Sequence, residues 1–384
     1  MRSRSLKLTT AALFFASAFS LSAHAQNNRI NVVTTAVPFL RVAPDARSSG
    51  MGDIGLATSP DASAGFWNIG KVAFNESKGG LVATYSPWLK DIVNDVYLAS
   101  LSGFYKIDEN SALNLGFRYF NLGDIQFTDD NSNNIGSGRP REFGIDVGYS
   151  RRLSSKLGLG VSLRYINSDL AAGVGSGGYT YKVGSSVAGD IGLFYDNKNE
   201  AGNGFAFGAQ LSNLGTKIAY TDNADAKDYI PANLGIGATY TKNFDDKNKI
   251  TFGIDANKLL VPTPPENLSD PNALSDYRSK AVVGSWFSSF GDAPGGFGEE
   301  MREFQLSAGA EYWYNNQFAL RAGYFYEDKT KGNRRYFTAG LGLKYNIFGI
   351  NFSYLAPTGS GVTRIPLSNT IRLSVAFDFG NNAD

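Results

Sequence analysis

The sequence contains no cysteine, and its one histidine, His24, lies close to the N-terminus. Without cysteine there is no disulfide framework, no thiolate nucleophile and no Cys-ligated metal site. With no further imidazole, the chain also lacks the usual base of a hydrolase and the commonest metal ligand. Its charges nearly balance, 36 Lys+Arg against 35 Asp+Glu, whereas a nucleic-acid-binding protein carries a basic excess. We therefore expect no enzymatic activity, no cofactor, no bound metal and no nucleic-acid partner.

Residues 1–25 have the three parts of a secretory signal peptide. Positive residues precede an apolar stretch at 8–21, and a small-residue cleavage box follows at Ala23-His24-Ala25. A membrane anchor is the alternative, but the apolar stretch is shorter than the roughly 20 residues that a spanning helix needs. We expect the chain to be exported and cleaved before Gln26, which would leave a mature chain without histidine.

Beyond residue 80, apolar side chains alternate with small or polar ones in segments of about ten residues. In 156–166, for example, Leu159, Val161 and Leu163 share one face, and glycine, serine and arginine share the other. This pattern is typical of strands between lipid and a polar lumen, and it gives 14 of them, an even number as a closed single-chain barrel requires. The predicted strands are 81–87, 95–106, 112–121, 142–151, 156–166, 187–196, 204–213, 231–241, 249–258, 303–313, 317–326, 334–345, 347–356 and 370–379.

The connections between these strands alternate in length. Short connections such as 107–111 alternate with long connections such as 121–141 and 259–302. Outer-membrane barrels have short periplasmic turns and long external loops, whereas a soluble β-sandwich has no reason to collect its long loops at one end. We predict an all-β protein whose 14-stranded antiparallel transmembrane barrel spans 81–379 in the outer membrane. A tail at 380–384 follows, and both termini are expected in the periplasm.

Charged residues of both signs occupy positions predicted to face the lumen. An ion-selective pore would line itself with one sign, so the mixture argues against such a pore. It favours a lumen that is crossed by salt bridges or filled by another segment of the chain. These residues are Arg118, Arg164, Arg321, Lys344, Arg372, Glu142, Asp146, Asp190, Asp255, Glu311 and Asp378.

The N-terminal segment 26–80 does not alternate in this way. It is rich in Ala and Gly, and we expect helices to begin at Asp45 and at either Ser59 or Asp61, each beside a proline. We predict that the segment folds inside the lumen as a plug, and a periplasmic arm that binds a partner is the alternative. The side chains singled out in the plug are Asp45, Arg47, Trp67 and Asn68.

The connection at 259–302 is much longer than joining two strands requires, and long loops are usually functional. It carries aromatic residues around a Gly/Pro-rich stretch at 291–296. Exposed aromatic side chains on a bent loop are typical anchors for a partner's pocket. We predict that they bind a partner, the alternatives being that they cap the barrel mouth or dip into the outer leaflet. The four residues are Trp286, Phe287, Phe290 and Phe297.

Two stretches resemble a known family. The run PFLRVAPDARSSGMGDIGLATSPDASAGFWN at 38–68 and the run FSSFGDAPGGFGEE at 287–300 closely resemble the PorV (LptO) family of the Bacteroidetes type IX secretion system. The resemblance implies a non-enzymatic barrel that binds the C-terminal signal domain of exported cargo. It also implies as partners the giant translocon barrel (SprA/Sov-like), a PorU-like attachment protein at the cell surface, and outer-membrane lipid.

More remotely, a 14-stranded barrel with an N-terminal hatch is similar to the FadL family of hydrophobic-compound transporters. The FadL hatch carries an Asn-Pro-Ala motif, where this chain has Asn68-Ile69-Gly70. A FadL-like channel is therefore the alternative function, and it predicts an apolar internal pocket and a displaceable plug. A lipid A deacylase, to which the name LptO refers, would require an unusual Ser/Asp or Ser/Lys site.

Overall fold

The computed structural model describes residues 30–88, 93–129, 131–176, 179–223, 226–265, 267, 270–358 and 369–381. The predicted signal peptide at 1–25 and the last three residues of the predicted tail lie outside the described residues. The account below concerns the compact unit that contains residues 31–384.

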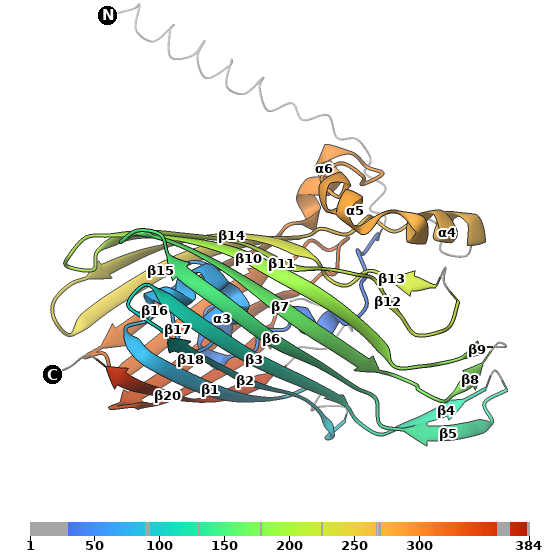
Figure 1. Ribbon diagram of the computed structural model, residues 1–384, viewed down its shortest axis with the longest axis horizontal. Coiled ribbons are helices and arrows are strands. Elements are labelled where there is room, and N and C mark those ends of the chain that lie inside the picture. Colours follow the sequence, from blue (N-terminus) through green and yellow to red (C-terminus); the bar gives the residue numbers. More distant parts are fainter. Residues whose placement is uncertain are drawn as a thin grey trace, which may run out of the picture. The chain divides into compact units, whose positions relative to one another are not determined.

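In the described residues, 14 antiparallel strands close into a barrel, and the predicted number and order of strands are confirmed. Each strand pairs with the barrel strands before and after it, and β1 (Ser77–Pro87) pairs with β20 (Ile371–Asn381) to complete the ring (Figure 1). The remaining strands are β2 (Val96–Lys106), β3 (Ser111–Leu122), β6 (Arg141–Arg152), β7 (Leu157–Asp169), β10 (Gly184–Lys198), β11 (Gly204–Gly215), β14 (Asn233–Asn243), β15 (Asn248–Leu259), β16 (Gln305–Tyr314), β17 (Phe318–Tyr326), β18 (Arg335–Tyr345) and β19 (Phe348–Pro357).

The alternation of apolar and polar residues in the sequence corresponds to the outer and inner faces of the barrel wall. On β7, Val161 and Leu163 are 49% and 76% exposed, whereas Ser162 and Arg164 between and beside them are buried. A strand turns successive side chains to opposite faces, so the apolar set points outward and the polar set points into the lumen. An apolar exterior around a polar interior is the reverse of a soluble β-sandwich, and that alternative is therefore excluded.

The two ends of the barrel differ, as the loop lengths predict. At the turn end, tight connections join the strands. In the three-residue connection between β16 and β17, Asn315 and Asn316 both have positive φ, the type I′ turn geometry that favours Asn. At the loop end stand three small two-stranded sheets: β4 (Ile125–Thr128) with β5 (Asn134–Gly138), β8 (Gly175–Ser176) with β9 (Tyr179–Thr180), and β12 (Ile218–Ala219) with β13 (Lys227–Asp228).

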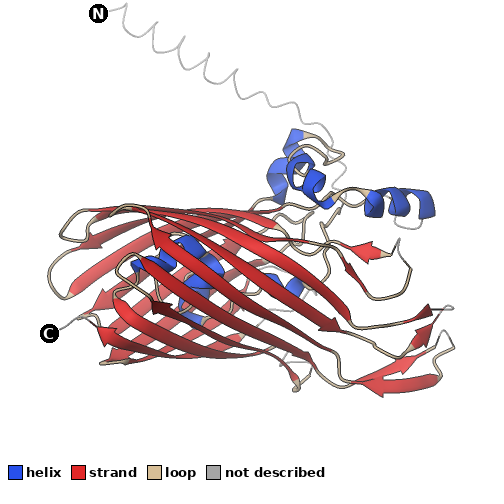
Figure 2. Cartoon of the chain, viewed as in Figure 1, coloured by secondary structure: helices blue, strands red, loops and turns tan. Residues whose placement is uncertain are grey.

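The long connection between β15 and β16 contains helices, which the sequence did not predict. They are α4 (Pro271–Ser279), α5 (Val282–Ser288), α6 (Phe297–Glu300) and the 3₁₀ turn η3 (Met301–Glu303). Figure 2 shows this group, called the helical segment below, at the loop end and outside the ring of strands. No helix in the described part of the chain has the length and hydropathy of a membrane span.

The segment before β1 lies within the ring of strands (Figure 2). It forms η1 (Pro38–Arg41), α2 (Ala46–Ser49), α3 (Ala64–Trp67) and η2 (Ile69–Phe74), and we call residues 31–76 the plug. Asp45 caps α2 as predicted, because its carboxylate accepts the Ser48 amide at 2.8 Å. The predicted start of the next helix at Ser59 or Asp61 is wrong. That helix begins at Ala64.

The plug runs the length of the barrel. The Asn31 amide donates to the carbonyl of Thr330 in the connection between β17 and β18, at the loop end. Ser77 pairs with Asn381 at the turn end, where β20 finishes. Asn31 and Asn381 therefore lie at opposite ends of the barrel. The expected periplasmic placement of both termini stays a prediction, because residues 26–29 and 382–384 lie outside the described part of the chain.

Candidate functional site

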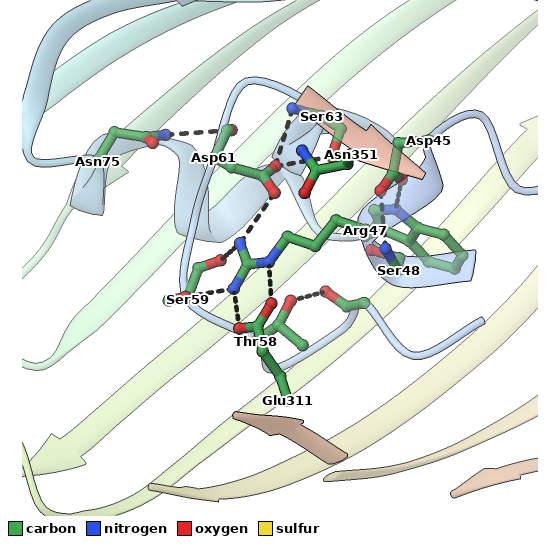
Figure 3. A network of polar contacts seen from close by, with 12 residues as sticks. Asp45, Arg47, Ser48, Thr58, Ser59, Asp61, Ser63, Asn75, Glu311 and Asn351 are labelled. Atoms are coloured by element: carbon green, nitrogen blue, oxygen red, sulfur yellow. Dashed lines mark hydrogen bonds and ion pairs between the residues drawn. The ribbon is translucent and has the colours of Figure 1, made fainter. Parts of the chain in front are cut away.

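Arg47 of α2 is the centre of the polar network that joins the plug to the wall (Figure 3). Its Nε and Nη2 donate to the two carboxylate oxygens of Glu311 on β16, at 2.9 and 2.8 Å. Its Nη1 donates to Asp61 at 2.9 Å, and its Nη2 also donates to the Ser59 hydroxyl at 2.7 Å. The two carboxylates therefore hold one guanidinium from both sides, and Arg47 bonds the plug to itself as well as to β16.

The network continues into the wall. Arg321 of β17 donates from Nε to Glu311 at 2.7 Å and from Nη1 to Asn351 of β19 at 2.8 Å. Glu311 thus lies between two guanidinium groups, an arrangement that compensates the cost of burying a carboxylate. These contacts confirm that Arg321 and Glu311 face the lumen, and they show that salt bridges and a filling segment occur together.

The other predicted plug residues hold the plug's internal shape. Trp67 donates from Nε1 to Asp45 at 2.6 Å, so the carboxylate that caps α2 also fixes the end of α3. Asn68 is completely buried and donates to the carbonyls of Leu56 in the plug and Leu193 in the wall at 3.0 and 2.9 Å. These polar groups are engaged in hydrogen bonds, and the arrangement suits structural support.

A second polar network fills the lumen near η1. Arg164 forms ion pairs with Asp146 and Asp190, the latter at 2.8 Å. Arg118 donates to the carbonyl of Leu40 in the plug at 3.0 Å. Arg164, Asp146 and Asp190 therefore pair with each other, Arg118 satisfies the plug backbone, and Glu142 accepts a hydrogen bond from the Ser168 hydroxyl.

Two small cavities lie between plug and wall. One lumenal cavity has a volume of about 40 Å³ and is lined by Arg41, Asp53, Arg164 and several amide side chains, with Phe66 and Trp67 at its side. A second, beside Phe66 and Arg118, has a volume of about 20 Å³. An engineered cavity that binds benzene measures about 150 Å³ and is apolar. These two cavities suit a few water molecules.

The structure separates the four aromatic residues predicted to bind a partner. Trp286 is half-buried against a cluster that includes Tyr229, Leu260 and Val261. In contrast, 75% of Phe287, 47% of Phe290 and 79% of Phe297 is exposed. Trp286 therefore holds α5 in place, and the three phenylalanines form an exposed apolar surface.

A buried charge cluster that the sequence did not reveal fastens the helical segment to the barrel. Lys258 of β15 contacts Glu300 at 3.1 Å and Glu303 at 2.5 Å, and Lys331 contacts Glu299 at 2.6 Å and Glu303 at 3.0 Å. We call these five residues the anchor. The sequence did contain a signal for this cluster. Lys258 has the same alternation as the outward-facing residues of its strand, and a charge on that apolar face needs a partner.

The surroundings of the anchor shift the pKa values of two carboxyl groups, Glu299 and Asp292, in opposite directions. Burial alone would raise the pKa of Glu299, but the hydrogen bond from Lys331 and the attraction of its charge hold that pKa below its usual value. Burial raises the pKa of Asp292, which accepts from the Thr263 amide and hydroxyl and has Glu300 and Glu303 nearby. Lys331 therefore outweighs burial at Glu299, whereas at Asp292 burial outweighs the hydrogen bonds from Thr263.

Solved structures of similar fold come from hydrocarbon channels. The toluene transporter TbuX of Ralstonia pickettii aligns with a TM-score of 0.51 and 12% identity over 87% of this chain and 98% of its own. The P. putida toluene transporter TodX aligns with a TM-score of 0.51 and 14% identity over the same shares. A FadL homologue from Pseudomonas aeruginosa aligns with a TM-score of 0.48 and 12% identity over 91% of this chain and 99% of its own. The two likenesses at 0.51 show the fold alone.

No curated protein sequence matches the chain. A family model described as type IX secretion system protein PorV matches residues 24–266, which is more than half of the sequence. The matched region contains the plug, Arg47 included, and the first nine strands of the barrel, whereas Glu311 lies beyond it. The chain belongs to the PorV family and is an outer-membrane barrel of the type IX secretion system.

Proposed function

We propose that this barrel binds the C-terminal signal domain of exported cargo at the type IX translocon and passes the cargo to the attachment complex at the cell surface. It does so without catalysis and without conducting the cargo. The observation that carries this proposal is the filled lumen. A secretion-system barrel whose interior is occupied by bonded side chains contributes through its surface.

The loop end is the side that meets cargo in this proposal. Barrels of the outer membrane keep short turns in the periplasm and long loops outside, so we assign the loop end to the cell surface. The helical segment and the three small sheets all stand there, and together they provide far more surface than the turn end. A translocon barrel and a PorU-like attachment protein are the partners in this proposal.

A FadL-like channel for hydrophobic compounds is the second candidate, and the barrel likeness to the two toluene transporters favours it. Such a channel needs an apolar pocket and a plug that can be displaced. The cavity of about 40 Å³ beside Trp67 is lined largely by polar groups. Arg47 and Asn68 bond the plug to β16 and β10. Both features support an adaptor over a channel.

The test is direct binding in a purified system. The detergent-solubilised barrel, checked for folding by heat-modifiable gel migration, is immobilised and exposed to an isolated C-terminal signal domain. We expect saturable binding that disappears when the loop-end connections are removed by protease and that is absent for the same cargo's passenger domain. A folded barrel that ignores the signal domain but takes up toluene into vesicles would overturn the proposal in favour of the channel.

A further inference from the structure

The helical segment has its polar and apolar faces exchanged. On α6 and η3, Phe297 and Met301 are 79% and 52% exposed, while Glu300 and Glu303 are 4% and 8% exposed. A surface helix in water presents its charges to solvent and turns its apolar side chains to the core. Here the carboxylates point to the barrel, where Lys258 and Lys331 neutralise them.

The segment lies against the outer face of the wall. On β15, Phe252 and Ile254 are exposed to the outside, and Lys258 follows them with the same alternation, yet only 1% of Lys258 is exposed. It is opposite Leu234 of β14, which also belongs to an outward-facing set. Because Glu300 and Glu303 bind Lys258, the helical segment covers the outward surface of β15 at the loop end of that strand.

A second contact fixes the same position. The buried cluster around Tyr229 and Val261 packs with Trp286 of α5 and also with Leu211 and Leu234, which face outward from β11 and β14. Figure 1 shows α5 and α6 beyond the wall at the loop end. The segment is therefore attached at two places along the edge of the barrel's apolar exterior.

We propose that the outer face of the helical segment is immersed in the lipid leaflet at the loop end of the barrel. This face carries Val283 and Phe287 of α5, Phe297 of α6 and Met301 of η3, all of them exposed. The ring of Phe290 lies beside the anchor, with its centroid 5.7 Å from the Lys258 ammonium. The outer face continues the apolar exterior, where Ile254 and the neighbouring Leu306 of β16 are 63% and 48% exposed. Aromatic residues at the edge of this surface match the aromatic girdles of membrane barrels.

Lipid explains the exchanged faces better than an aqueous partner does. A surface that waits in water for a partner gains by keeping its charges on the outside, and α6 with η3 keeps three glutamates against the wall. A segment that faces hydrocarbon must neutralise its charges internally, because an unpaired charge there is costly. The proposal concerns only the contact of the helical segment with lipid. Cargo recognition is left to the other surfaces of the loop end.

The absence of cysteine makes the test clean. Phe297→Cys and Phe287→Cys are each spin-labelled, reconstituted in phosphatidylcholine/phosphatidylglycerol vesicles, and compared for collision with oxygen and with a water-soluble nickel complex. Leu163→Cys on the barrel exterior is the lipid reference, and Asp222→Cys, whose side chain is 92% exposed at the loop end, is the aqueous reference. Gel migration verifies folding, and Met301→Cys on the same face replaces any variant that fails to fold.

We expect both labels to collide with oxygen in preference to nickel to the same extent as the label at Leu163. If these labels collide with nickel as often as the label at Asp222 does, the proposal is wrong. The exposed phenylalanines would then be candidates for contact with a protein partner. No partner protein is present in these vesicles, so protection from nickel has lipid as its source.

Discussion

The plug and the helical segment are both short-helix insertions in the same barrel, and they treat charge in opposite ways. In the plug, Arg47 and Asn68 bind wall and plug together, and the surrounding side chains are buried. On α6 and η3 of the helical segment, three glutamates are gathered in one anchor on the barrel side, and Phe297 is left exposed. The first arrangement belongs to a core, whereas the second belongs to an interface.

The difference shows that a segment's surroundings decide where its polar groups go. Inside the lumen, the wall supplies partners such as Glu311 and Gln210 on every side, so polar residues can point anywhere. Outside, the neighbouring wall residues Phe252 and Ile254 are apolar, and Glu300 and Glu303 of the helical segment converge on Lys258. Each region can therefore be tested by removing its central cation.

The largest effect is expected from Arg47→Met. The substitution leaves Asp61 without its cation and removes one of the two guanidinium groups that flank Glu311, and breaking a buried pair of this kind costs about 3–5 kcal/mol. We expect the free energy of unfolding in urea to fall by that amount for the barrel in micelles. Arg139→Met is the matched control, because Arg139 and Asp124 form an exposed pair with side chains 65% and 64% exposed. An equal stability of both variants would show that the plug is not bonded as described.

Gly323→Ala should have the next largest effect. A β-carbon at this position on β17 would meet the backbone of Met51 at 2.1 Å and of Gly52 at 2.2 Å, so plug and wall would have to separate. Overpacking of this kind costs about 1–3 kcal/mol. Gly298→Ala on α6 is the comparison, since nothing lies within 4 Å of its added methyl group. Urea unfolding of the two variants should differ, and a neutral Gly323→Ala would contradict the close contact.

Lys258→Met should act on the helical segment alone. Glu300 then loses its ammonium partner, while Glu303 keeps Lys331. We expect limited proteolysis within 260–304 to become about tenfold faster, which corresponds to ~1.4 kcal/mol of local stability. Lys344→Met, which breaks the half-exposed pair with Asp378, should leave that cleavage rate unchanged. Cleavage at the original rate would mean that the anchor does not hold the segment.

The smallest effect concerns pH and Asp292. Because its pKa in the folded protein lies above the ordinary 3.8, the folded state binds the proton more tightly than the unfolded state. Its contribution to stability is therefore present below pH 3.8 and is lost as the pH rises through the raised pKa. We expect the protection of α5 and α6 amides, measured relative to the intrinsic exchange rate at each pH, to fall over that range, and Asp292→Asn to flatten the change. An Asp222→Asn control should retain it, and an unaltered pH profile in Asp292→Asn would disprove the link.

The sequence predicts the wall much better than the insertions, for a physical reason. Residues such as Val161 and Leu163 alternate because lipid and lumen alternate, so a local pattern carries the information. The start of α3 depends on Asp61, whose carboxylate binds Arg47 and the Ser63 hydroxyl, and Arg47 in turn binds Glu311 far away in the chain. Local helix signals at Ser59 and Asp61 could not contain that contact.

The candidate site follows the same rule. Charges such as Arg164 and Glu311 were placed in the lumen from alternation alone, but their partners depend on the path of the plug. The exposure of Phe287 and Phe297 agrees with an exposed aromatic loop, while Trp286 packs inward because Tyr229 from another connection meets it. The role of Lys258 was missed because its partners are 42 and 45 residues further along the chain.

The path of the plug also determines how the molecule can be assembled. Asn31 is bonded at the loop end, and Ser77 begins β1 at the turn end, so the chain crosses the whole interior before the first strand starts. The two described spaces between plug and wall measure about 40 and 20 Å³, far too small for a polypeptide chain to pass through. We therefore expect the strands to close around an N-terminal segment that is already in place. In that order of events, the pairing of β1 with β20 joins the first and last strands of the ring around the plug.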